Sequence, residues 1–198
     1  MAKVQGIKEK LHWPLYDAFF VPNGGGSPAP NFGSEMIKRD PRVLRFFVDV
    51  QNKTKLETNV QASGMLPSQN TFEARTMRVV VSHILKDART LIPNSFFLAE
   101  LIYNSVTTLL VGEKIMMEVP TFYFPSGAGI SPGDGTANHG EPDPMATFRF
   151  GEPVPIEPHQ NFRVEMLFPH DAPHIVKAAL GPMRIWVVLD GYLTRDAQ

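Results

Sequence analysis

The stretch Val106-Thr-Thr-Leu-Leu-Val111, Gly112-Glu113, Lys114-Ile-Met-Met-Glu-Val119 carries the clearest fold signal in the chain. Two runs rich in β-branched and large apolar residues flank a two-residue turn that contains a glycine. Glycine adopts the positive φ angles that tight hairpin turns require. The stretch therefore predicts an antiparallel β-hairpin.

Strand patterns continue on both sides of this hairpin. In the stretch 42–50, Leu44, Phe46, Val48 and Val50 alternate with other residues, as in a strand that buries one face. Similar patterns predict strands over 72–85, 145–150, 154–156, 161–168 and 184–190, and the last is apolar enough to be central in a sheet.

Helices are few in the expected structure. The stretch 93–103 fits a short helix and a strand equally well, and its pattern does not decide between them. Asp171 is a suitable N-cap for a short helix that would run to Leu180, where Gly181 stops it. The 18 prolines among 198 residues argue against long helices, because proline lacks the N–H that a helix interior needs. With about eight strands and no alternation of strands and helices, we expect an all-β fold, an antiparallel β-sandwich.

The chain is expected to divide into an N-terminal arm, residues 1–41, and a body, residues 42–198. The arm contains Asn23-Gly-Gly-Gly-Ser-Pro-Ala-Pro30, which suits neither a helix nor an interior strand, because its glycines are too flexible and its prolines lack a donor. Aromatic residues nearby would anchor such an arm, and we expect it to order on the surface of a partner. The body contains a long loop, residues 125–144, and loops of this length usually have a role.

Charge is distributed unevenly along the chain. Residues 1–55 contain nine Lys/Arg and five Asp/Glu, against ten and fifteen in residues 56–198, although the net charge of the whole chain is only −1. A basic N-terminal region suits contact with the phosphates of nucleic acid or of lipid headgroups, and a solvated terminus is the alternative. The candidate basic contacts are Lys3, Lys8, Lys10, Lys38 and Arg39.

The composition excludes several classes of site. The chain has no cysteine, which removes disulfides, thiolate metal sites and cysteine nucleophiles. No apolar run approaches the roughly 20 residues of a membrane-spanning helix. Pro14 and Asp17 interrupt the one stretch near the N-terminus that could form the core of a signal peptide. We therefore expect a soluble protein made in the cytoplasm.

The motif Gly129-Ile-Ser131-Pro-Gly133 matches the nucleophile elbow of serine hydrolases in form only. The residue after the nucleophile must donate its backbone N–H to the oxyanion, and Pro132 has none. The serine also does not lie between a strand and a helix. We therefore expect no catalytic residues and no enzyme.

Polar residues of the same loop do not fit a known metal site. They are Asp134, Asn138, His139, Glu141 and Asp143. Against the calcium-loop pattern, His139 stands where glycine is required and Met145 where the final glutamate is required. Pro173 separates His170 from His174 and spoils a shared helical face. We expect solvated polar groups here, with no metal, no cofactor and no small-molecule substrate.

Five segments together carry a resemblance to a known family. They are Thr54-Lys-Leu-Glu-Thr-Asn59 followed by Gly64-Met-Leu-Pro67, Leu110-Val-Gly-Glu-Lys114 running to Pro120, Phe124-Pro-Ser-Gly-Ala-Gly129, Pro155-Ile-Glu-Pro-His-Gln-Asn-Phe-Arg-Val164 and Val188-Leu-Asp-Gly-Tyr-Leu-Thr-Arg195. Their order resembles the layout of jelly-roll capsid proteins of tailless icosahedral bacteriophages, in particular those whose coat subunits carry one jelly roll each.

This resemblance implies a single eight-stranded jelly roll with an extended N-terminal arm and one or two short helices. It implies a capsid subunit that assembles, alone or with a second coat protein, into an icosahedral shell. The partners would be copies of the chain and other capsid proteins, and the shell interior would face the genome or an internal membrane. The expected location is the virion, after synthesis in the host cytoplasm.

Two other functions stay open at the level of sequence. One is a carbohydrate- or ligand-binding jelly-roll module of a virion spike or tail, with its site in the loop 125–144. The other is a divergent cupin-like metalloenzyme, although the chain has no His-x-His pair of the kind that a cupin site uses.

Overall fold

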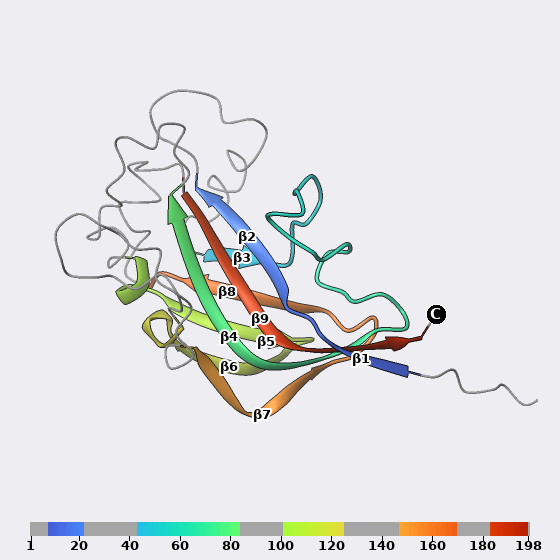
Figure 1. The fold of residues 1–198 in the computed structure, drawn as a ribbon. Coiled ribbons are helices and arrows are strands. Elements are labelled where there is room, and N and C mark those ends of the chain that lie inside the picture. The colour runs from blue at the N-terminus through green and yellow to red at the C-terminus, as the bar shows by residue number, and fades with distance from the viewer. Residues whose placement is uncertain (1–7, 22–42, 84–100, 125–146, 170–182, 198) are drawn as a thin grey trace, which may run out of the picture.

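The computed structural model describes residues 8–21, 43–83, 101–124, 147–169 and 183–197, which form a β-sandwich (Figure 1). The described residues contain nine strands, one short 3₁₀ helix and the helical residues 101–103. The strands and the 3₁₀ helix are β1 (Lys8–His12), β2 (Leu15–Val21), β3 (Val43–Phe46), β4 (Thr71–His83), β5 (Val106–Val111), β6 (Lys114–Pro120), η1 (Thr121–Tyr123), β7 (Phe148–Ile156), β8 (Phe162–Leu167) and β9 (Met183–Asp196).

The strands form two antiparallel sheets with the connectivity of a jelly roll. In the first sheet, β9 lies between β4 and an edge made of β1 and β2, and β7 is the opposite edge. The second sheet has the order β3-β8-β5-β6. If β1 and β2 are counted as one broken strand, the first strand pairs with the last, the second with the seventh, the third with the sixth and the fourth with the fifth. This rolled-up hairpin is a single jelly roll of eight strand positions, so the predicted fold class is confirmed.

The hairpin predicted from Val106 to Val119 is present as β5 and β6. Gly112 in its turn has a φ of 60°, a value that glycine tolerates better than other residues. The predicted central position of the apolar stretch 184–190 is also confirmed, since β9 has paired neighbours on both sides.

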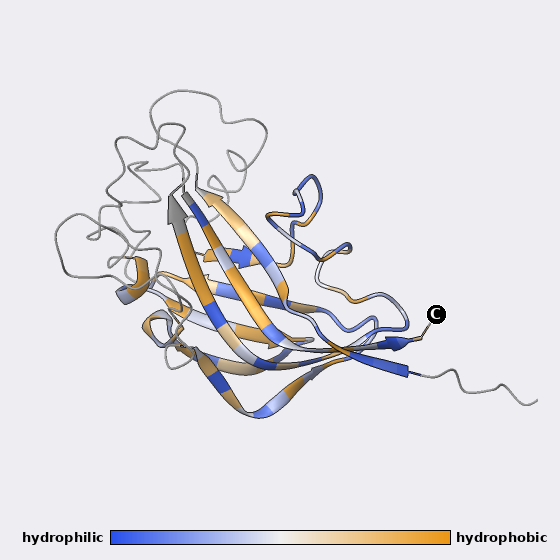
Figure 2. Cartoon of the chain, in the orientation of Figure 1, coloured by the Kyte–Doolittle hydropathy of each residue, from blue (hydrophilic) through white to orange (hydrophobic). Residues whose placement is uncertain are grey.

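The core lies between the two sheets, and in several strands alternate residues point into it. In β8, Phe162, Val164 and Met166 are buried, while Arg163 and Glu165 between them are half-buried. Figure 2 shows apolar and polar residues interspersed along the strands of both sheets. Phenylalanines provide much of the volume, because Phe46, Phe47, Phe72, Phe124, Phe162 and Phe168 are all fully buried.

Three predicted strands have different bounds in the structure. The strand expected over 42–50 ends at Phe46, because Phe47 has a φ of 69° and leaves the extended conformation. Its ring packs against Phe162, with 5.1 Å between the ring centroids. The two strands expected over 145–150 and 154–156 are one strand, β7, which holds a wide bulge between its two paired ends.

The strands of the sandwich begin at Lys8, well before residue 42. β1 and β2 fall within the stretch 1–41 that was expected to form an arm, and Leu15, Ala18 and Phe19 are buried in the sandwich. Of the remaining predictions, residues 101–103 are helical, whereas the helix over 171–180 and the loop 125–144 lie outside the described residues. Within the described part of the chain, no helix is long and apolar enough to cross a membrane.

Candidate assembly surface

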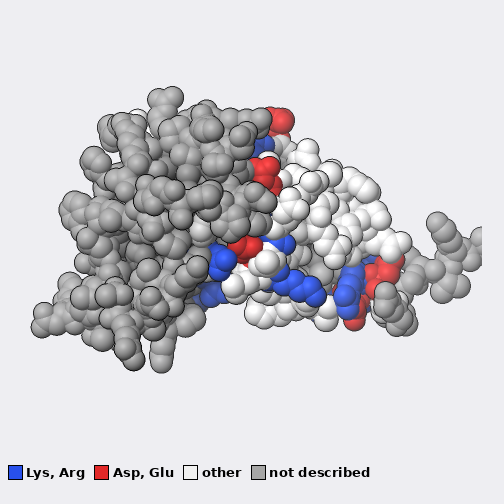
Figure 3. Space-filling model, turned by 90° about the horizontal axis from the view of Figure 1, so that it is seen from above, with Lys and Arg blue, Asp and Glu red and all other residues white. Residues whose placement is uncertain are grey.

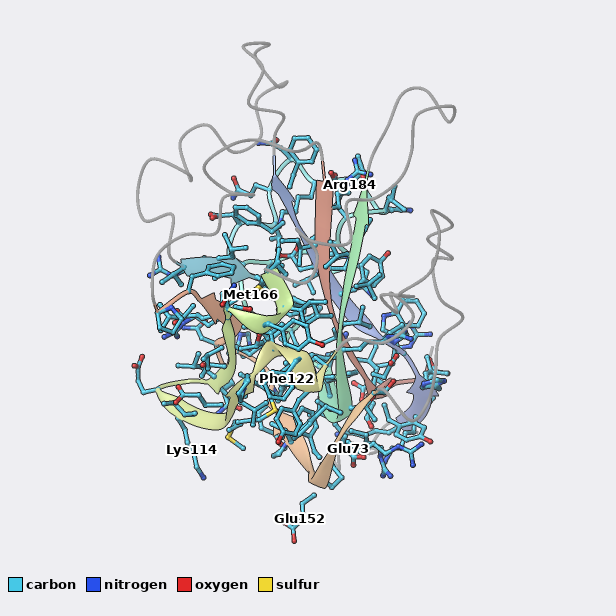
Figure 4. The ribbon with its side chains drawn as sticks, turned by 90° about the vertical axis from the view of Figure 1, so that its left-hand side faces the viewer. Glu73, Lys114, Phe122, Glu152, Met166 and Arg184 are labelled. Carbon is cyan, nitrogen blue, oxygen red and sulfur yellow. The ribbon has the colours of Figure 1, made fainter. Side chains whose placement is uncertain are left out.

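An exposed group of aromatic side chains lies around η1, the short helix that directly follows β6, and reaches the side chains of β7. Tyr103, Phe122 and Tyr123 are 66%, 45% and 53% exposed, and Phe148 and Phe150 on β7 are half-buried. We call these five residues the aromatic patch. Successive ring centroids, in the order given, are 6.1, 4.9, 6.4 and 5.7 Å apart, within the range of favourable aromatic contacts. Figure 4 looks onto this side of the sandwich, with Phe122 near the centre.

The backbone that carries the patch is fixed at both ends of η1. The Thr121 N–H donates to the Ser105 carbonyl at 2.9 Å, which joins the start of η1 to the residue before β5. After η1, the Phe124 carbonyl accepts a hydrogen bond of 3.0 Å from the N–H of Val79 in β4. The Phe124 side chain is fully buried, and its ring centroid lies 5.2 Å from that of Phe148. The two exposed rings therefore stand between fixed points in both sheets.

A chain of three buried hydroxyl groups supports the base of η1. Thr121 Oγ1 lies 2.6 Å from Ser105 Oγ and 2.7 Å from Thr107 Oγ1, and Ser105 Oγ lies 2.7 Å from the Leu101 carbonyl oxygen. All three hydroxyl-bearing residues are buried. Buried hydroxyls that satisfy one another hold a unique geometry, because any other arrangement leaves a polar group without a partner.

Thr121→Val is expected to lower the free energy of unfolding by about 1–3 kcal/mol, because it leaves the buried Thr107 hydroxyl without its partner. Thermal unfolding followed by circular dichroism measures the loss, and the near-ultraviolet signal reports whether the aromatic rings become disordered. An unchanged melting temperature with an unchanged near-ultraviolet spectrum would show that the hydroxyl chain does not support η1.

Exposed aromatic rings on a rigid base suit binding to another macromolecular surface. Isolated exposed apolar residues are common, but a contiguous group marks an interaction site more often. Aromatic residues are also enriched among the residues that carry most of the energy of protein interfaces. Side chains already fixed in place lose little conformational freedom on binding, which favours affinity.

A buried ion pair organises the opposite edge of the sandwich. The Asp17 side chain, on the inner face of β2, is fully buried, and Lys53 Nζ lies 2.8 Å from both of its carboxylate oxygens. The N–H of Phe47 donates to Asp17 Oδ2 at 2.7 Å and thereby fixes the end of β3. Burial raises the pKa of Asp17, although the charge of Lys53 and the hydrogen bonds from Lys53, Phe47 and Thr58 oppose this effect.

The segment 53–60 runs along β2 and is fastened to it. The Asn59 side chain accepts from the Tyr16 N–H at 3.0 Å and donates to the Pro14 carbonyl at 2.7 Å. The Leu56 carbonyl accepts a hydrogen bond of 3.0 Å from Trp186 Nε1. These contacts occupy the outer edge of β2 and leave the Leu56 side chain 62% exposed.

Glu57 closes the turn of this segment. Its carboxylate accepts hydrogen bonds of 2.9 Å from both the N–H and the hydroxyl of Thr54, and it lies 3.2 Å from the Arg184 guanidinium. Burial acts to raise the pKa of Glu57, but the hydrogen bonds from Thr54 and the charge of Arg184 outweigh it and lower the pKa below its ordinary value.

The structure places two of the five predicted basic contacts. Lys8 and Lys10 are exposed on β1, and Lys10 Nζ lies 2.8 Å from Glu73 Oε2 and 5.1 Å from the ring centroid of Tyr192. Figure 3 shows basic and acidic side chains next to one another on this view of the described surface. The other three, Lys3, Lys38 and Arg39, lie outside the described residues.

The motifs considered for catalysis and metal binding also fall largely outside the described residues. These are the Gly129–Gly133 motif, the polar residues of the loop 125–144, and the pair His170 and His174. Among the residues that are described, no three His, Asp or Glu side chains lie close enough together to hold a metal ion.

The aromatic patch was not predicted from the sequence. The available signal was the run Thr121-Phe-Tyr-Phe124 directly after a proline-terminated strand. Comparisons of the chain with protein-family models, with curated proteins and with solved structures found no match.

Proposed function

We propose that the chain is a coat subunit that assembles, alone or with a second coat protein, into the icosahedral shell of a tailless bacteriophage. The single jelly-roll topology supports this proposal, because viral capsid subunits are among the proteins that use this fold. Fold alone does not set function, since lectin domains and cupins share it. The exposed surface of the sandwich must therefore distinguish a coat subunit from these other functions.

The observation that carries the proposal is the aromatic patch on its rigid base. A subunit that assembles into a shell buries its lateral contact surfaces against neighbouring subunits. It therefore needs apolar side chains that are exposed in the monomer and held in a fixed geometry. Phe122 and Tyr123 meet both conditions, because they are exposed while the residues on either side of them, Thr121 and Phe124, are buried and hydrogen-bonded.

The basic residues of β1 fit the same proposal in a secondary way. Lys8 and Lys10 are exposed on β1, the first strand of the first sheet along the chain. In a shell they would face the interior and contact the phosphates of the genome or of an internal membrane.

The double variant Phe122→Ser with Tyr123→Ser is expected to abolish assembly and leave a folded monomer, because both side chains are about half exposed and neither belongs to the buried core. Electron microscopy shows whether shells or regular capsomers form, and analytical ultracentrifugation gives the subunit mass. Leu167→Ser is the matched control, since Leu167 is 41% exposed on β8, which is not an edge strand and has no residue in the aromatic patch.

The assembly state of the wild-type protein tests the proposed function itself. Closed shells or regular capsomers in the purified protein support it. A wild-type protein that stays monomeric at all concentrations, or that binds immobilised glycans as a monomer, contradicts it and favours a ligand-binding jelly-roll module.

A further inference from the structure

The loop 47–58 follows β3 and is arranged around one buried carboxylate, that of Asp17 in β2. The Phe47 N–H, at the start of the loop, donates to Asp17 Oδ2 at 2.7 Å. Lys53 Nζ, in the middle, lies 2.8 Å from both carboxylate oxygens, and Thr58, at the end, is hydrogen-bonded to Asp17 as well. In Figure 1 the chain after β3 passes beside β2. Because the Asp17 side chain is fully buried, one proton can remove the charge around which the whole loop is arranged.

Phe47 holds a backbone conformation that bulky residues rarely adopt. Its φ of 69° lies in the left-handed region, where any residue with a large side chain is strained. The conformation is held on one side by the hydrogen bond to Asp17 and on the other by the Gly64 N–H, which donates to the Phe47 carbonyl at 2.6 Å. Strained residues of this kind cluster in segments that switch between two arrangements. A neutral Asp17 would stabilise this turn less, because a hydrogen bond to a charged acceptor is stronger than one to a neutral acceptor.

Lys53 has a second carboxylate within electrostatic reach. Glu57 belongs to the same loop, and the charge of Lys53 acts on it as well as on Asp17. Glu57 is itself held by hydrogen bonds from Thr54 and lies 3.2 Å from the Arg184 guanidinium. Acidic and basic groups therefore alternate from β2 through the loop to β9. The long, flexible side chain of Lys53 stands between the two acids and can turn from one to the other.

Lys53 is the charged group that acts on Asp17, and the other charged side chains of the surrounding elements are engaged elsewhere or exposed. On β3 and β8 they alternate with the buried residues and so lie on the outer face of the second sheet. Those of β4 and β9 that are nearest in register to Asp17 lie on the outer face of the first sheet. The groups are Asp49 and Lys55, which are exposed in the loop, Arg45 and Arg163, which pair with Glu165, Arg78, which pairs with Asp190, and Arg184, which pairs with Glu57.

The two carboxylates of the loop region respond to acid differently. Burial raises the pKa of Asp17, although the charge of Lys53 opposes this effect. Burial acts in the same direction on Glu57, but the hydrogen bonds from Thr54 and the charge of Arg184 outweigh it and lower its pKa. As the pH falls, Asp17 therefore takes up a proton while Glu57 is still charged. A carboxyl group whose pKa is raised in the folded state stabilises that state when it is protonated, so this step does not unfold the sandwich.

We propose that Asp17, Lys53 and Glu57 form an acid-responsive switch, in which uptake of a proton by Asp17 turns Lys53 toward Glu57 and loosens the loop 47–58 while the sandwich stays folded. Switches of this type consist of a local change of charge and a segment that it biases between two arrangements. The loop covers the outer edge of β2 and reaches Trp186 of β9 through the Leu56 carbonyl. Acid would uncover this edge, and neutral pH would cover it again. The switch operates within one subunit and is independent of the proposed assembly.

The fluorescence of Trp186 tests the switch, because its indole N–H donates to the Leu56 carbonyl of the loop. The chain has two tryptophans, so Trp13→Phe leaves Trp186 as the only one. Between about pH 7 and 4, the emission of this parent variant should move to longer wavelength in one reversible step, since water replaces the Leu56 carbonyl. Far-ultraviolet circular dichroism should stay unchanged over the same range. Amide exchange, corrected for its intrinsic pH dependence, should become faster at Phe47 and stay slow in β8.

Two substitutions in the Trp13→Phe background identify the titrating group. Asp17→Asn should show the acid emission already at pH 7 and no step, because asparagine carries no charge to hold Lys53. Asp49→Asn is the matched control, since it removes an exposed carboxylate of the same loop, and it should titrate as the parent does. The switch is wrong if the parent shows no step, or if Asp17→Asn titrates like the parent. It is also wrong if the step coincides with loss of the circular dichroism signal.

A measurement without substitution at residue 17 covers the case in which Asp17→Asn does not fold. Carbon NMR of the Asp17 carboxyl group in the Trp13→Phe protein gives its titration directly. The midpoint should coincide with that of the Trp186 emission, because one proton drives both changes. Two separate midpoints overturn the inference.

Discussion

Lys53→Met is expected to lower the free energy of unfolding by about 3–5 kcal/mol at pH 7, because it leaves the fully buried Asp17 carboxylate without its counter-ion. The carboxylate would keep its hydrogen bonds from the N–H of Phe47 and from Thr58, but these contacts do not offset the loss of a cation 2.8 Å from both oxygens. The effect should be among the largest of any single substitution outside the apolar core.

The pH dependence of this loss follows from the pKa of Asp17. Burial already raises it in the wild type, and removing Lys53 takes away the charge that opposes burial. A carboxyl group whose pKa is raised in the folded state stabilises the protein fully below its unfolded pKa, and it loses that contribution as the pH rises through the folded pKa. The deficit of Lys53→Met relative to wild type should therefore shrink as the pH is lowered toward 4.

The double variant Asp17→Asn with Lys53→Met separates the charge from the hydrogen bond. Asparagine keeps a side-chain oxygen that accepts from the Phe47 N–H, and no buried charge remains. Removing both charges of a buried pair is often far less destabilising than removing one. Urea unfolding of the wild type, both single variants and the double variant gives the coupling energy. A double variant as unstable as Lys53→Met alone would show that the ion pair is not the cause.

The same ion pair explains why residues 8–21 carry no clear strand signal and were expected to belong to an arm. In β2 the inward positions are Leu15, Asp17 and Phe19, so a charged residue interrupts the apolar alternation that marks a strand. Its partner, Lys53, is 36 residues away in the chain. Only the folded structure brings the two together, whereas the glycines and prolines of 23–30 give a clear local signal for irregular chain.

The strands that were predicted correctly have signals contained in their own residues. β8 alternates apolar and polar residues, and the hairpin of β5 and β6 has a glycine at the position with positive φ. The aromatic patch has no such signal. Phe122, Tyr123 and Phe124 are consecutive aromatic residues, and the turn of η1 with its buried hydroxyl chain determines that only Phe124 enters the core.

The first sheet bends along one line that crosses its strands, and no pattern within a single strand predicts this bend. Pro14 breaks the edge between β1 and β2, and Arg75 is an extra residue in β4 opposite the step from Asp190 to Gly191 in β9. In β7, residues 150–153 bulge opposite the same Arg75. Such bulges increase the bend and twist of a sheet. Trp13 lies at the break between β1 and β2 and Phe150 lies in the bulge of β7, so the bend determines where both side chains stand.

Gly191→Ala is expected to destabilise the protein by more than about 3 kcal/mol, above the usual range for over-packing. A Cβ on residue 191 would lie 1.9 Å from the Glu73 carbonyl oxygen and 2.9 Å from Phe72 Cζ. The first contact is with backbone of the paired strand β4, which cannot move aside as a flexible side chain can. The two strands would have to separate at the bend, and the hydrogen bond from the Trp13 N–H to the Gly191 carbonyl would be disturbed.

Gly151→Ala is the matched control, because a Cβ on residue 151 meets nothing within 4 Å. It lies in the bulge of β7 on the same bend, so it reports whether a methyl group there is harmful in itself. We expect thermal unfolding to show a folded Gly151→Ala with a melting temperature close to that of the wild type, and a Gly191→Ala that is largely unfolded or strongly destabilised. Equal behaviour of the two variants would mean that the close approach of β9 to β4 does not set the bend. Any Gly191→Ala protein that does fold should assemble poorly if the proposed function is right, because Phe150 of the aromatic patch lies in the bulge on the same bend.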